Sequence, residues 1–527
     1  MDWTFPYPSQ RMPVFARNVV ATSQPLAAQA GLDMLRAGGN AIDAAIATAI
    51  ALTVVEPTSN GIGSDAFALV WAGGGLHGMN ASGRSPANMT RESYDDKTEI
   101  SRRGWDGITV PGCVSGWTML SKQFGRLPFD QLFQPAVRYA RDGFLVSPQT
   151  AYYWNRGSRA YDGMTAWQNT FAPDGRAPRV GEQFRSEDHA VTLEDIASTQ
   201  GESFYRGALA SRIAEASRAG GGAMTEADLA QHEAEWVRPI SVDYNGWTLN
   251  EIPPNGQGLV ALIALGMLRH LDVKKHGVDS PEGLHLQIEA MKLAFADGHR
   301  YIADIDFMTN TTVEDLLDDA YLRARAAEID PARAIDPKHG TPKPGGTIYL
   351  TAADDEGNMV SYIQSNYTGF GSGIVVPGTG IALQNRGCCF TLERGHPNEL
   401  GPSKRPYHTI IPGFVTKDGQ PVMSFGVMGG YMQPQGHAQV VVRMADYDQN
   451  PQAAIDAPRW QVGDGMEITI EPGFADDVYD ALSAMGHDVR RARARTVSHG
   501  RGQAIYRLED GYVAASDGRA DGQAVGY

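Results

Sequence analysis

Thr347 stands where a polar linker gives way to a β-rich segment, and this position allows a specific chemistry. The stretch before it, residues 331–346, reads PARAIDPKHGTPKPGG and is too rich in proline, glycine and polar residues to bury a face, so we expect it to be mobile. If the Thr347 hydroxyl attacks the carbonyl of Gly346, the resulting ester can hydrolyse and leave a threonine with a free α-amine. An α-amine has a reference pKa of about 7.7 to 8.0, so part of it is unprotonated at neutral pH and can activate the adjacent hydroxyl. The sequence therefore predicts cleavage between Gly346 and Thr347, with nucleophile and base on one residue.

Two adjacent glycines could stabilise the negative charge that such a reaction creates. Gly429 and Gly430 follow a predicted strand, Val422 to Gly426, and their backbone N–H groups could point into a cavity and hold an oxyanion. Spacing alone leaves an ordinary alternative open, in which the glycine pair is a turn and Thr347 merely starts a strand.

The first part of the chain is predicted to be helical and the last part strand-rich. Apolar residues at helical spacing predict a helix from Pro25 to Ala37, which Gly38 and Gly39 end. Asn40 can cap a second helix that ends near Glu56 and carries one buried apolar stripe. The other predicted elements are two helices, one strand and three hairpins: Phe129 to Asp142, Gly283 to Ile302, Phe67 to Trp71, 347–366, Ile410 to Phe425 and Ala504 to Ala515. This order favours an α+β fold, with helices packed on antiparallel sheets.

Composition excludes several classes of protein. The 527 residues are 42% hydrophobic and 20% charged, as in a globular protein with a large core, and one folded unit is compatible with this length. A formal charge of -16 repels phosphate backbones, so nucleic acid is not an expected partner, and the basic run 490–495 is interpreted as a solvated edge. The best apolar stretch, 41–55, is too short to span a bilayer, so no membrane partner is expected.

Cysteines, histidines and the N-terminus point to a cytoplasmic protein without a zinc site. The three cysteines show no paired spacing, and the histidines show no H-E-x-x-H or comparable metal-binding pattern. Residues 1–17 lack the basic and apolar regions of a secretory signal. We therefore expect a reducing compartment and no zinc hydrolase.

Longer motifs connect the chain to a known family. They are DMLRAGGNAIDAAIATAIAL (33–52), GIGSDAF (61–67), VPGCVSGW (110–117), QPAVRYARDGF (134–144), EAMKLAFADGHRYIADIDF (289–307), GFGSGI (369–374), GPSKRP (401–406), the pair Gly429 and Gly430, and ASDGRADGQAVGY (515–527). With these motifs in order, nearly the whole chain resembles the γ-glutamyltranspeptidase family of N-terminal nucleophile hydrolases.

The resemblance implies a fold, a cleavage and a mechanism. The fold is an αββα sandwich, and the precursor breaks into a large chain, residues 1–346, and a small chain, residues 347–527, which stay together in one folded unit. Thr347 attacks an amide, Gly429 and Gly430 hold the oxyanion, and water or another amine resolves the acyl-enzyme. No metal or other cofactor is implied.

Several positions depart from the family's substrate-binding pattern. Cys389 stands where the family has the aspartate that binds the substrate α-ammonium, and a neutral thiol cannot replace a carboxylate there. His408 and Thr409 match a pair of serines that contact the substrate carboxylate. Arg84 lies close to the position of the family's carboxylate-binding arginine, slightly shifted, and Arg386 is a further candidate for binding a carboxylate.

Two more positions concern the nucleophile. Gln364 replaces a threonine that supports the nucleophile in the family, and Asn366 matches a nearby asparagine across a one-residue gap. The pocket thus keeps candidate carboxylate binders and loses its ammonium binder.

We therefore expect hydrolysis of a small anionic amide, with oxamate first, by resemblance to an oxamate-hydrolysing branch of the family, and a glutaryl amide second. The alternatives are γ-glutamyl hydrolysis or transfer from glutathione, and an uncleaved, inactive relative with a binding role. Acceptor preference and oligomeric state, including a homo-oligomer, stay open.

Overall fold

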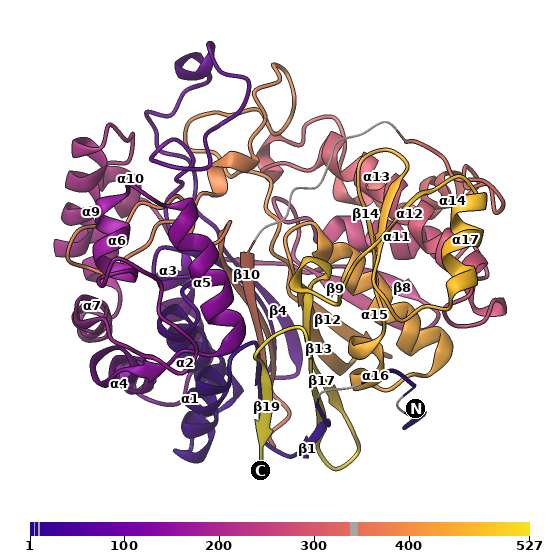
Figure 1. The fold of residues 1–527 in the computed structure, drawn as a ribbon, viewed down its shortest axis with the longest axis horizontal. Helices are drawn as coiled ribbons and strands as arrows, with labels where there is room; N and C mark the ends of the chain where they lie inside the picture. The colour runs from indigo at the N-terminus through magenta and orange to yellow at the C-terminus, as the bar shows by residue number, and fades with distance from the viewer. Residues whose placement is uncertain (5, 9–10, 338–345) are drawn as a thin grey trace.

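Two sheets lie face to face at the centre of the molecule, and helices cover the outer side of each. The computed structural model describes residues 1–4, 6–8, 11–337 and 346–527, so half of the predicted mobile linker, residues 338–345, lies outside the described residues. Within the described part each sheet has seven strands, and Figure 1 shows the resulting order of helices, sheet, sheet and helices. This order confirms the predicted αββα sandwich.

We name the two sheets A and B, and every strand pair within them is antiparallel. Sheet A has the order β19 (Gln523–Gly526), β2 (Val19–Thr22), β10 (Gly346–Ala353), β11 (Met359–Tyr367), β3 (Asp65–Ala72), β4 (Gly75–Ala81) and β7 (Glu235–Val237). Sheet B has the order β1 (Val14–Ala16), β18 (Tyr512–Ser516), β17 (Arg501–Arg507), β13 (Gln420–Met428), β12 (Gly413–Lys417), β9 (Trp247–Glu251) and β8 (Ile240–Tyr244). The strand that carries Thr347 is therefore central in sheet A, between β2 and β11.

The outer face of sheet A shares one apolar core with the helices of the first part of the chain. These are α1 (Pro25–Arg36), α2 (Ala41–Val55), α3 (Cys113–Phe124), α4 (Gln134–Asp142), α5 (Pro148–Ala160), α6 (Thr165–Phe171), α7 (Glu187–Ser198), α8 (Glu202–Arg206), α9 (Ala208–Ala219) and α10 (Glu226–Ala230). A second core joins the outer face of sheet B to α11 (Gly258–Leu268), α12 (Pro281–Tyr301), α13 (Val313–Leu316), α14 (Asp319–Ala326), α15 (Met432–Tyr447), α16 (Pro451–Asp456) and α17 (Asp476–Ala484).

Short elements complete the fold. They are a small sheet of β14 (Trp460–Val462), β15 (Glu467–Ile470) and β16 (Asp488–Arg491), the pair β5 (Phe144–Leu145) and β6 (Gln183–Phe184), and the 3-10 turns η1 (Arg91–Tyr94), η2 (Phe129–Phe133), η3 (Val273–Lys275), η4 (Ile305–Phe307), η5 (Arg386–Cys389) and η6 (Val497–His499). No helix in the described ranges is long and apolar enough to cross a membrane.

The first two helices begin and end as the sequence predicts, but α2 is more buried than predicted. The Asn40 side chain accepts hydrogen bonds from the N–H groups of Ile42 and Asp43, and the Asp43 carboxylate accepts one from Asn40 N–H, which closes a capping box. Every residue of α2 is buried, whereas the sequence predicted one buried stripe. The reason is that α2 lies between the outer face of sheet A and the helices α3 and α4.

Other predicted elements appear with shifted ends. The helix predicted from Phe129 to Asp142 is a 3-10 turn followed by α4, because Pro135 lacks the N–H that a continuous helix needs. The helix predicted from Gly283 to Ile302 is α12, and the three predicted hairpins are the strand pairs β10–β11, β12–β13 and β17–β18. In the hairpin that starts near Thr347, β10 packs across the sandwich against β13 and β17 of sheet B.

Candidate active site at the start of β10

Thr347 is the second residue of β10, and its side chain faces the space between the two sheets. It is 1% exposed, and its Oγ1 atom lies 3.1 Å from the Oγ atom of Ser365 on β11. Tyr349, two residues further on the same face, belongs to the apolar core between the sheets. Thr347 therefore presents its hydroxyl to the interior of the sandwich.

A β-bulge sets the contact between these two hydroxyls. β10 and β11 pair Gly346 with Tyr367 but Ile348 with Gln364, so two residues of β11 stand opposite Thr347. The bulge falls where the family resemblance needed a one-residue gap.

The bulge also corrects the role predicted for Gln364. The side chain of Gln364 points to the helical side of sheet A, where its Oε1 accepts from Tyr362 Oη at 2.8 Å and its Nε2 donates to Asn60 Oδ1 at 2.9 Å. Alternation along the strand puts Ser365, not Gln364, on the face of Thr347. Ser365 is thus the side chain that can support the Thr347 hydroxyl.

Asn366 lies beside the same site with one unused donor. Its Oδ1 atom accepts a hydrogen bond from Ser64 Oγ at 2.8 Å, while its buried Nδ2 has no partner among the described residues. An unpartnered buried amide is costly in a closed protein, so this donor is available to a bound molecule.

Gly429 and Gly430 follow β13 and precede α15. Both have positive φ, 145° and 63°, which favours glycine at each position. Among the hydrogen bonds between described residues, neither N–H acts as a donor, and both groups lie just ahead of the N-terminus of α15. Free N–H groups there attract negative charge because of the helix dipole.

Arg501 connects the glycine pair to Thr347. It is the register partner of Met428, the residue before Gly429, and its Nη2 donates to the Thr347 carbonyl oxygen at 2.7 Å. Its Nη1 donates to Glu56 Oε1 at 2.7 Å. The start of β10 and the end of β13 are therefore joined through one side chain.

Arg386 brings a buried positive charge close to Thr347. It is fully buried on η5, and its Nη1 and Nη2 donate to Thr409 Oγ1 at 2.6 Å and to Ser365 Oγ at 3.3 Å. The guanidinium also lies over the Tyr367 ring, 4.5 Å from its centre. In the part of the chain that the structure describes, no carboxylate forms a salt bridge with Arg386, so the group can receive an anion.

Cys389 lies next to Arg386 at the edge of a pocket. Burial raises the pKa of its thiol above the ordinary value, so the thiol is neutral. The pocket, of about 260 Å³, is lined by Cys389 together with Tyr367, Tyr431, Cys388, Arg102 and Thr391, among others. The pocket therefore extends from Tyr367, whose ring lies beneath Arg386, to Tyr431, the residue after Gly430.

Thr409 is joined to the glycine pair by a residue that the sequence did not single out. Gln257 Nε2 donates to the carbonyl oxygens of Thr409, at 2.5 Å, and Gly430, at 2.9 Å. Tyr407 Oη in turn donates to Gln257 Oε1 at 3.1 Å. These bonds hold the partner of Arg386 and the second glycine in fixed relation.

His408 does not contact the site in the predicted way. It is fully buried, its Nε2 lies 3.1 Å from Asp65 Oδ2, and its Nδ1 accepts from Ile410 N–H at 3.4 Å. Burial, with the charges of Arg386 and Arg405, lowers the pKa of His408, and burial raises the pKa of Asp65 to about 7. With both ring nitrogens engaged by the protein, His408 has none left for a substrate, which corrects the prediction.

Arg84 is also placed elsewhere. Its Nη1 forms an ion pair with Asp304 Oδ2 at 2.8 Å, and it lines a different pocket with Glu235 and Arg405. Because a carboxylate of the protein already neutralises it, Arg84 is not the substrate anchor that the sequence predicted. Of the predicted residues, the structure brings together Thr347, Asn366, Arg386, Cys389, Thr409 and the glycine pair.

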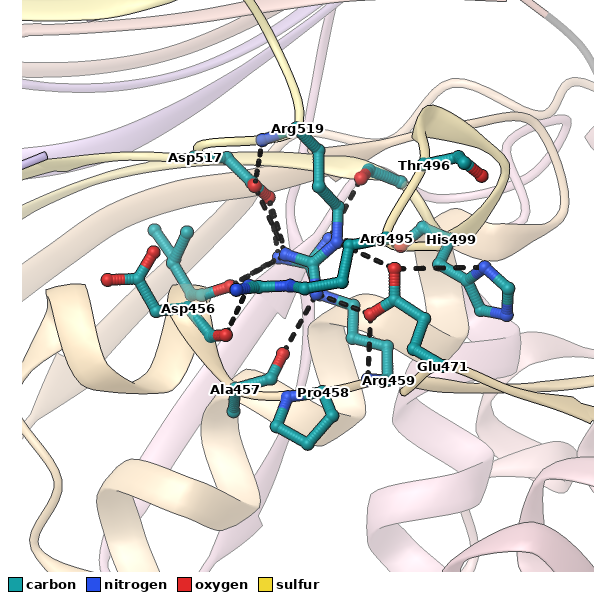
Figure 2. Close-up of polar contacts among 12 residues, drawn as sticks. Asp456, Ala457, Pro458, Arg459, Glu471, Arg495, Thr496, His499, Asp517 and Arg519 are labelled. Carbon is teal, nitrogen blue, oxygen red and sulfur yellow. Dashed lines mark hydrogen bonds and ion pairs between the residues drawn. The ribbon is translucent and has the colours of Figure 1, made fainter. Parts of the chain in front are cut away.

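A buried network of charges supports the turn in front of Arg501. Figure 2 shows Arg459 and Arg519 between the carboxylates of Asp517 and Glu471. Burial would raise the pKa of Asp517, but Arg519 and Arg459 lower it below its ordinary value. Arg459 Nη1 also donates to the carbonyl oxygens of His499, at 3.0 Å, and of Gly500, at 2.9 Å.

One group in the described ranges has the composition of a metal site: His285, Glu289 and His487. A lysine already supplies the positive charge there, since Lys292 Nζ lies 2.8 Å from Glu289 Oε1 and 3.4 Å from His487 Nδ1. The absence of a cofactor stays a prediction.

Sequence reasoning missed Ser365, Arg501, Glu56 and Gln257. Alternation along β11 identifies Ser365 only once the bulge is known, and no local pattern marks the other three, because each acts on a distant segment.

Comparisons with known proteins show the family of the chain. A family model described as Gamma-glutamyltranspeptidase matches residues 27–527. The chain is 37% identical to the glutathione hydrolase-like YwrD proenzyme of Bacillus subtilis, over 97% of this chain and 98% of that protein. It is 36% identical to the oxamate amidohydrolase proenzyme of Klebsiella pneumoniae, over 95% and 97%.

A solved structure is closer still in sequence. The cephalosporin acylase from Bacillus halodurans is 52% identical to this chain and superposes with a TM-score of 0.95, covering 100% of this chain and 99% of the acylase.

Proposed function

Since the chain belongs to the γ-glutamyltranspeptidase family and is a self-processing hydrolase of that family, we propose that Thr347 is its nucleophile and a small carboxylate-bearing amide its substrate. The observation that carries this proposal is the buried hydroxyl of Thr347, 3.1 Å from Ser365 Oγ, which itself accepts from Arg386.

Self-cleavage begins when the Thr347 hydroxyl attacks the Gly346 carbonyl. The hydroxyl proton passes to the leaving amide nitrogen, the Gly346–Thr347 peptide bond breaks, and an ester joins Gly346 to Thr347 Oγ1. Water then hydrolyses the ester, which leaves a carboxylate on Gly346 and a free α-amine on Thr347. The large chain is 1–346 and the small chain 347–527.

The same threonine then acts on the substrate. Its α-amine takes the hydroxyl proton while Oγ1 attacks the amide carbonyl. Gly429 N–H and Gly430 N–H, both without acceptors among the described residues, stabilise the oxyanion. The amine leaves with a proton, and water attacks the acyl-enzyme to release the acid.

The charges near Thr347 select the acyl group. Arg386 and Thr409 can bind a carboxylate, whereas Cys389 is neutral and cannot bind an α-ammonium group. Because Arg386 reaches Thr347 through a single intervening hydroxyl, the carboxylate must lie close to the attacked carbonyl. This geometry favours a short acyl group such as that of oxamate, and the similarity to an oxamate amidohydrolase supports the choice.

A second candidate is hydrolysis or transfer of γ-glutamyl groups from glutathione, which the similarity to a glutathione hydrolase-like protein favours. A glutaryl amide, which lacks the α-ammonium, lies between the two in length. The family relatives are proenzymes, so an inactive binding protein is not proposed. The cytoplasmic location rests on the sequence alone.

A substrate panel tests the proposal. Purified, cleaved protein is assayed with oxamate, a glutaryl anilide and a γ-glutamyl anilide, beside a Cys389→Asp variant. We expect the unchanged protein to prefer oxamate, and Cys389→Asp to lose that activity while gaining γ-glutamyl hydrolysis. Preference of the unchanged protein for the γ-glutamyl anilide would overturn the substrate assignment in favour of the second candidate.

A further inference from the structure

The carbonyl of Thr347 lies beyond the end of the neighbouring strand. β10 pairs with β2 only from Leu350, opposite Thr22, to Ala353, and β2 ends at Thr22. β10 therefore runs past the end of β2 here. On this edge, the carbonyl oxygens of the next two alternate residues of β10 accept hydrogen bonds from side chains instead of from the backbone of β2. Thr22 Oγ1 donates to Tyr349 O at 3.0 Å, and Arg501 Nη2 donates to Thr347 O at 2.7 Å.

Glu56 orients Arg501 from the other half of the molecule. Its Oε1 accepts from Arg501 Nη1 at 2.7 Å, and its Oε2 accepts from Ser23 Oγ at 2.5 Å. The side chains of Arg501 and Glu56 are 9% and 3% exposed, so water screens this pair little. Glu56 belongs to the proposed large chain and Arg501 to the proposed small chain, so their ion pair joins the two chains.

We propose that Arg501, oriented by Glu56, is a positioning residue that fixes the terminal threonine after cleavage and keeps its α-amine unprotonated at neutral pH. The inference rests on the proposed function of Thr347. The amine nitrogen and the carbonyl oxygen belong to the same residue, so a guanidinium bonded to that oxygen lies within a few ångströms of the amine. A positive charge at that distance disfavours protonation of the amine, and the guanidinium keeps its own proton.

Cleavage makes this contact more important. Thr347 then loses its covalent bond to Gly346 and becomes a chain end, and chain ends are poorly ordered unless they are held. Ser365 holds the hydroxyl and Arg501 holds the carbonyl, so the two contacts together fix the residue between them.

The surrounding charges allow the effect of Arg501 to be separated. The other charged and titratable groups around this contact are Glu56 and Tyr153, which lie beside Arg501, and Arg386, Asp65 and Tyr367, which lie around Ser365. Burial raises the pKa of both phenols, so they stay neutral. Arg386 disfavours protonation of the Thr347 α-amine, as Arg501 does. Glu56 favours protonation, so removal of its charge should lower the pKa of the amine measurably.

The test is the acidic limb of kcat/KM against pH, which reports the base of the free enzyme. Arg501→Met should move this limb to higher pH by about one unit and lower kcat about tenfold. Glu56→Gln should move the limb to lower pH, because the guanidinium then acts without its counter-charge. Arg501→Lys should keep the acidic limb at nearly the same pH as in the unchanged protein. It should lower kcat, because lysine lacks the planar guanidinium that donates both to Glu56 and to Thr347.

Arg507→Met, an exposed arginine of the same strand, is the matched control and should leave both quantities unchanged. The opposite shifts of Arg501→Met and Glu56→Gln support the inference, since a merely structural role would not give them. If Arg501→Met does not cleave itself and stays a single chain, the pH profile of Glu56→Gln alone tests the inference. An unmoved limb in cleaved Glu56→Gln overturns the role of Arg501, whereas failure of the unchanged protein to cleave at Thr347 overturns the proposed function itself.

Discussion

Thr347 Oγ1 and Ser365 Oγ lie 3.1 Å apart on adjacent strands, and Arg386 Nη2 lies 3.3 Å beyond the serine. Arg386 Nη2 and the backbone N–H of Tyr367 both donate to Ser365 Oγ, at 3.3 Å and 2.8 Å, so the serine hydroxyl lies between a buried cation and Thr347. A single hydroxyl thus links the proposed nucleophile to the proposed carboxylate-binding group.

Ser365→Ala should slow both self-cleavage and turnover. Loss of one buried hydrogen bond at Thr347 corresponds to about a tenfold decrease in kcat. The rate of appearance of the two chains on a gel and the steady-state kcat measure the two effects. Ser424→Ala is the control, because it removes a similar hydroxyl pair, with Thr351 at 2.6 Å, further along β10. Equal losses in both variants would mean that packing, not the contact with Thr347, matters.

Arg386→Met should raise KM for oxamate about a hundredfold, because a charge-assisted pair with the substrate carboxylate is worth roughly 1.5 to 3 kcal/mol. Activity toward an uncharged amide should change much less, and this contrast is the readout. Arg84→Met provides the comparison, since Arg84 is paired with Asp304 and lines another pocket. The assignment fails if Arg84→Met raises KM more than Arg386→Met does.

Gly429→Ala should lower kcat by about two to three orders of magnitude, the usual cost of an oxyanion donor that is lost or misplaced. A Cβ there would lie 3.2 Å from Gly500 Cα, at a φ of 145° that L side chains rarely adopt. Gly419→Ala carries similar backbone strain, with φ 72° and open space around it, at the far end of the same strand. If both variants have the same kcat, the glycine pair is only a turn.

Much of the fold follows from local patterns in the sequence. Asn40 and Asp43 predict the start of α2, and the turn residues predict the three hairpins, because caps and turns depend on neighbours in the chain. Thr347 could be located for the same reason, as the first polar residue of a strand after a linker.

The composition of the site could be predicted less well. Asp65 and His408 are 343 positions apart, and nothing near either residue shows that they pair. Arg84 was misplaced because its partner Asp304 is also distant in the chain, with a separation of 220. Side-chain partners across the sandwich depend on the packing of whole sheets, which local spacing does not encode.

Acid should destabilise the protein as the pH falls below about 6.5. Burial lowers the pKa of His189 to about 4 and the pKa values of His232 and His437 to about 3, so the folded state binds fewer protons than the unfolded state between these values and about 6.5. The contribution of these histidines to the free energy of unfolding is therefore complete above pH 6.5 and is lost as the pH falls toward 4. Asp65 and Glu251 act in the opposite sense, because burial raises their pKa values and this favours the folded state at low pH, but the lowered pKa values of His408, His487 and His499 add to the loss.

Urea unfolding at several pH values measures this loss. His189→Gln should flatten the dependence between pH 6.5 and 4, since His189 is buried on α7 beside Thr53 and is not among the residues of the proposed site. A urea midpoint that does not change from pH 7 to pH 4.5 would contradict the prediction.

Intact mass spectrometry of the purified protein beside its Thr347→Ala variant tests the central claim most directly. The account predicts two fragments that meet between Gly346 and Thr347 in the unchanged protein, and one chain of about 56.9 kDa in the variant. A single chain in the unchanged protein, or cleavage at the same bond in Thr347→Ala, would contradict the assignment of Thr347 as the nucleophile.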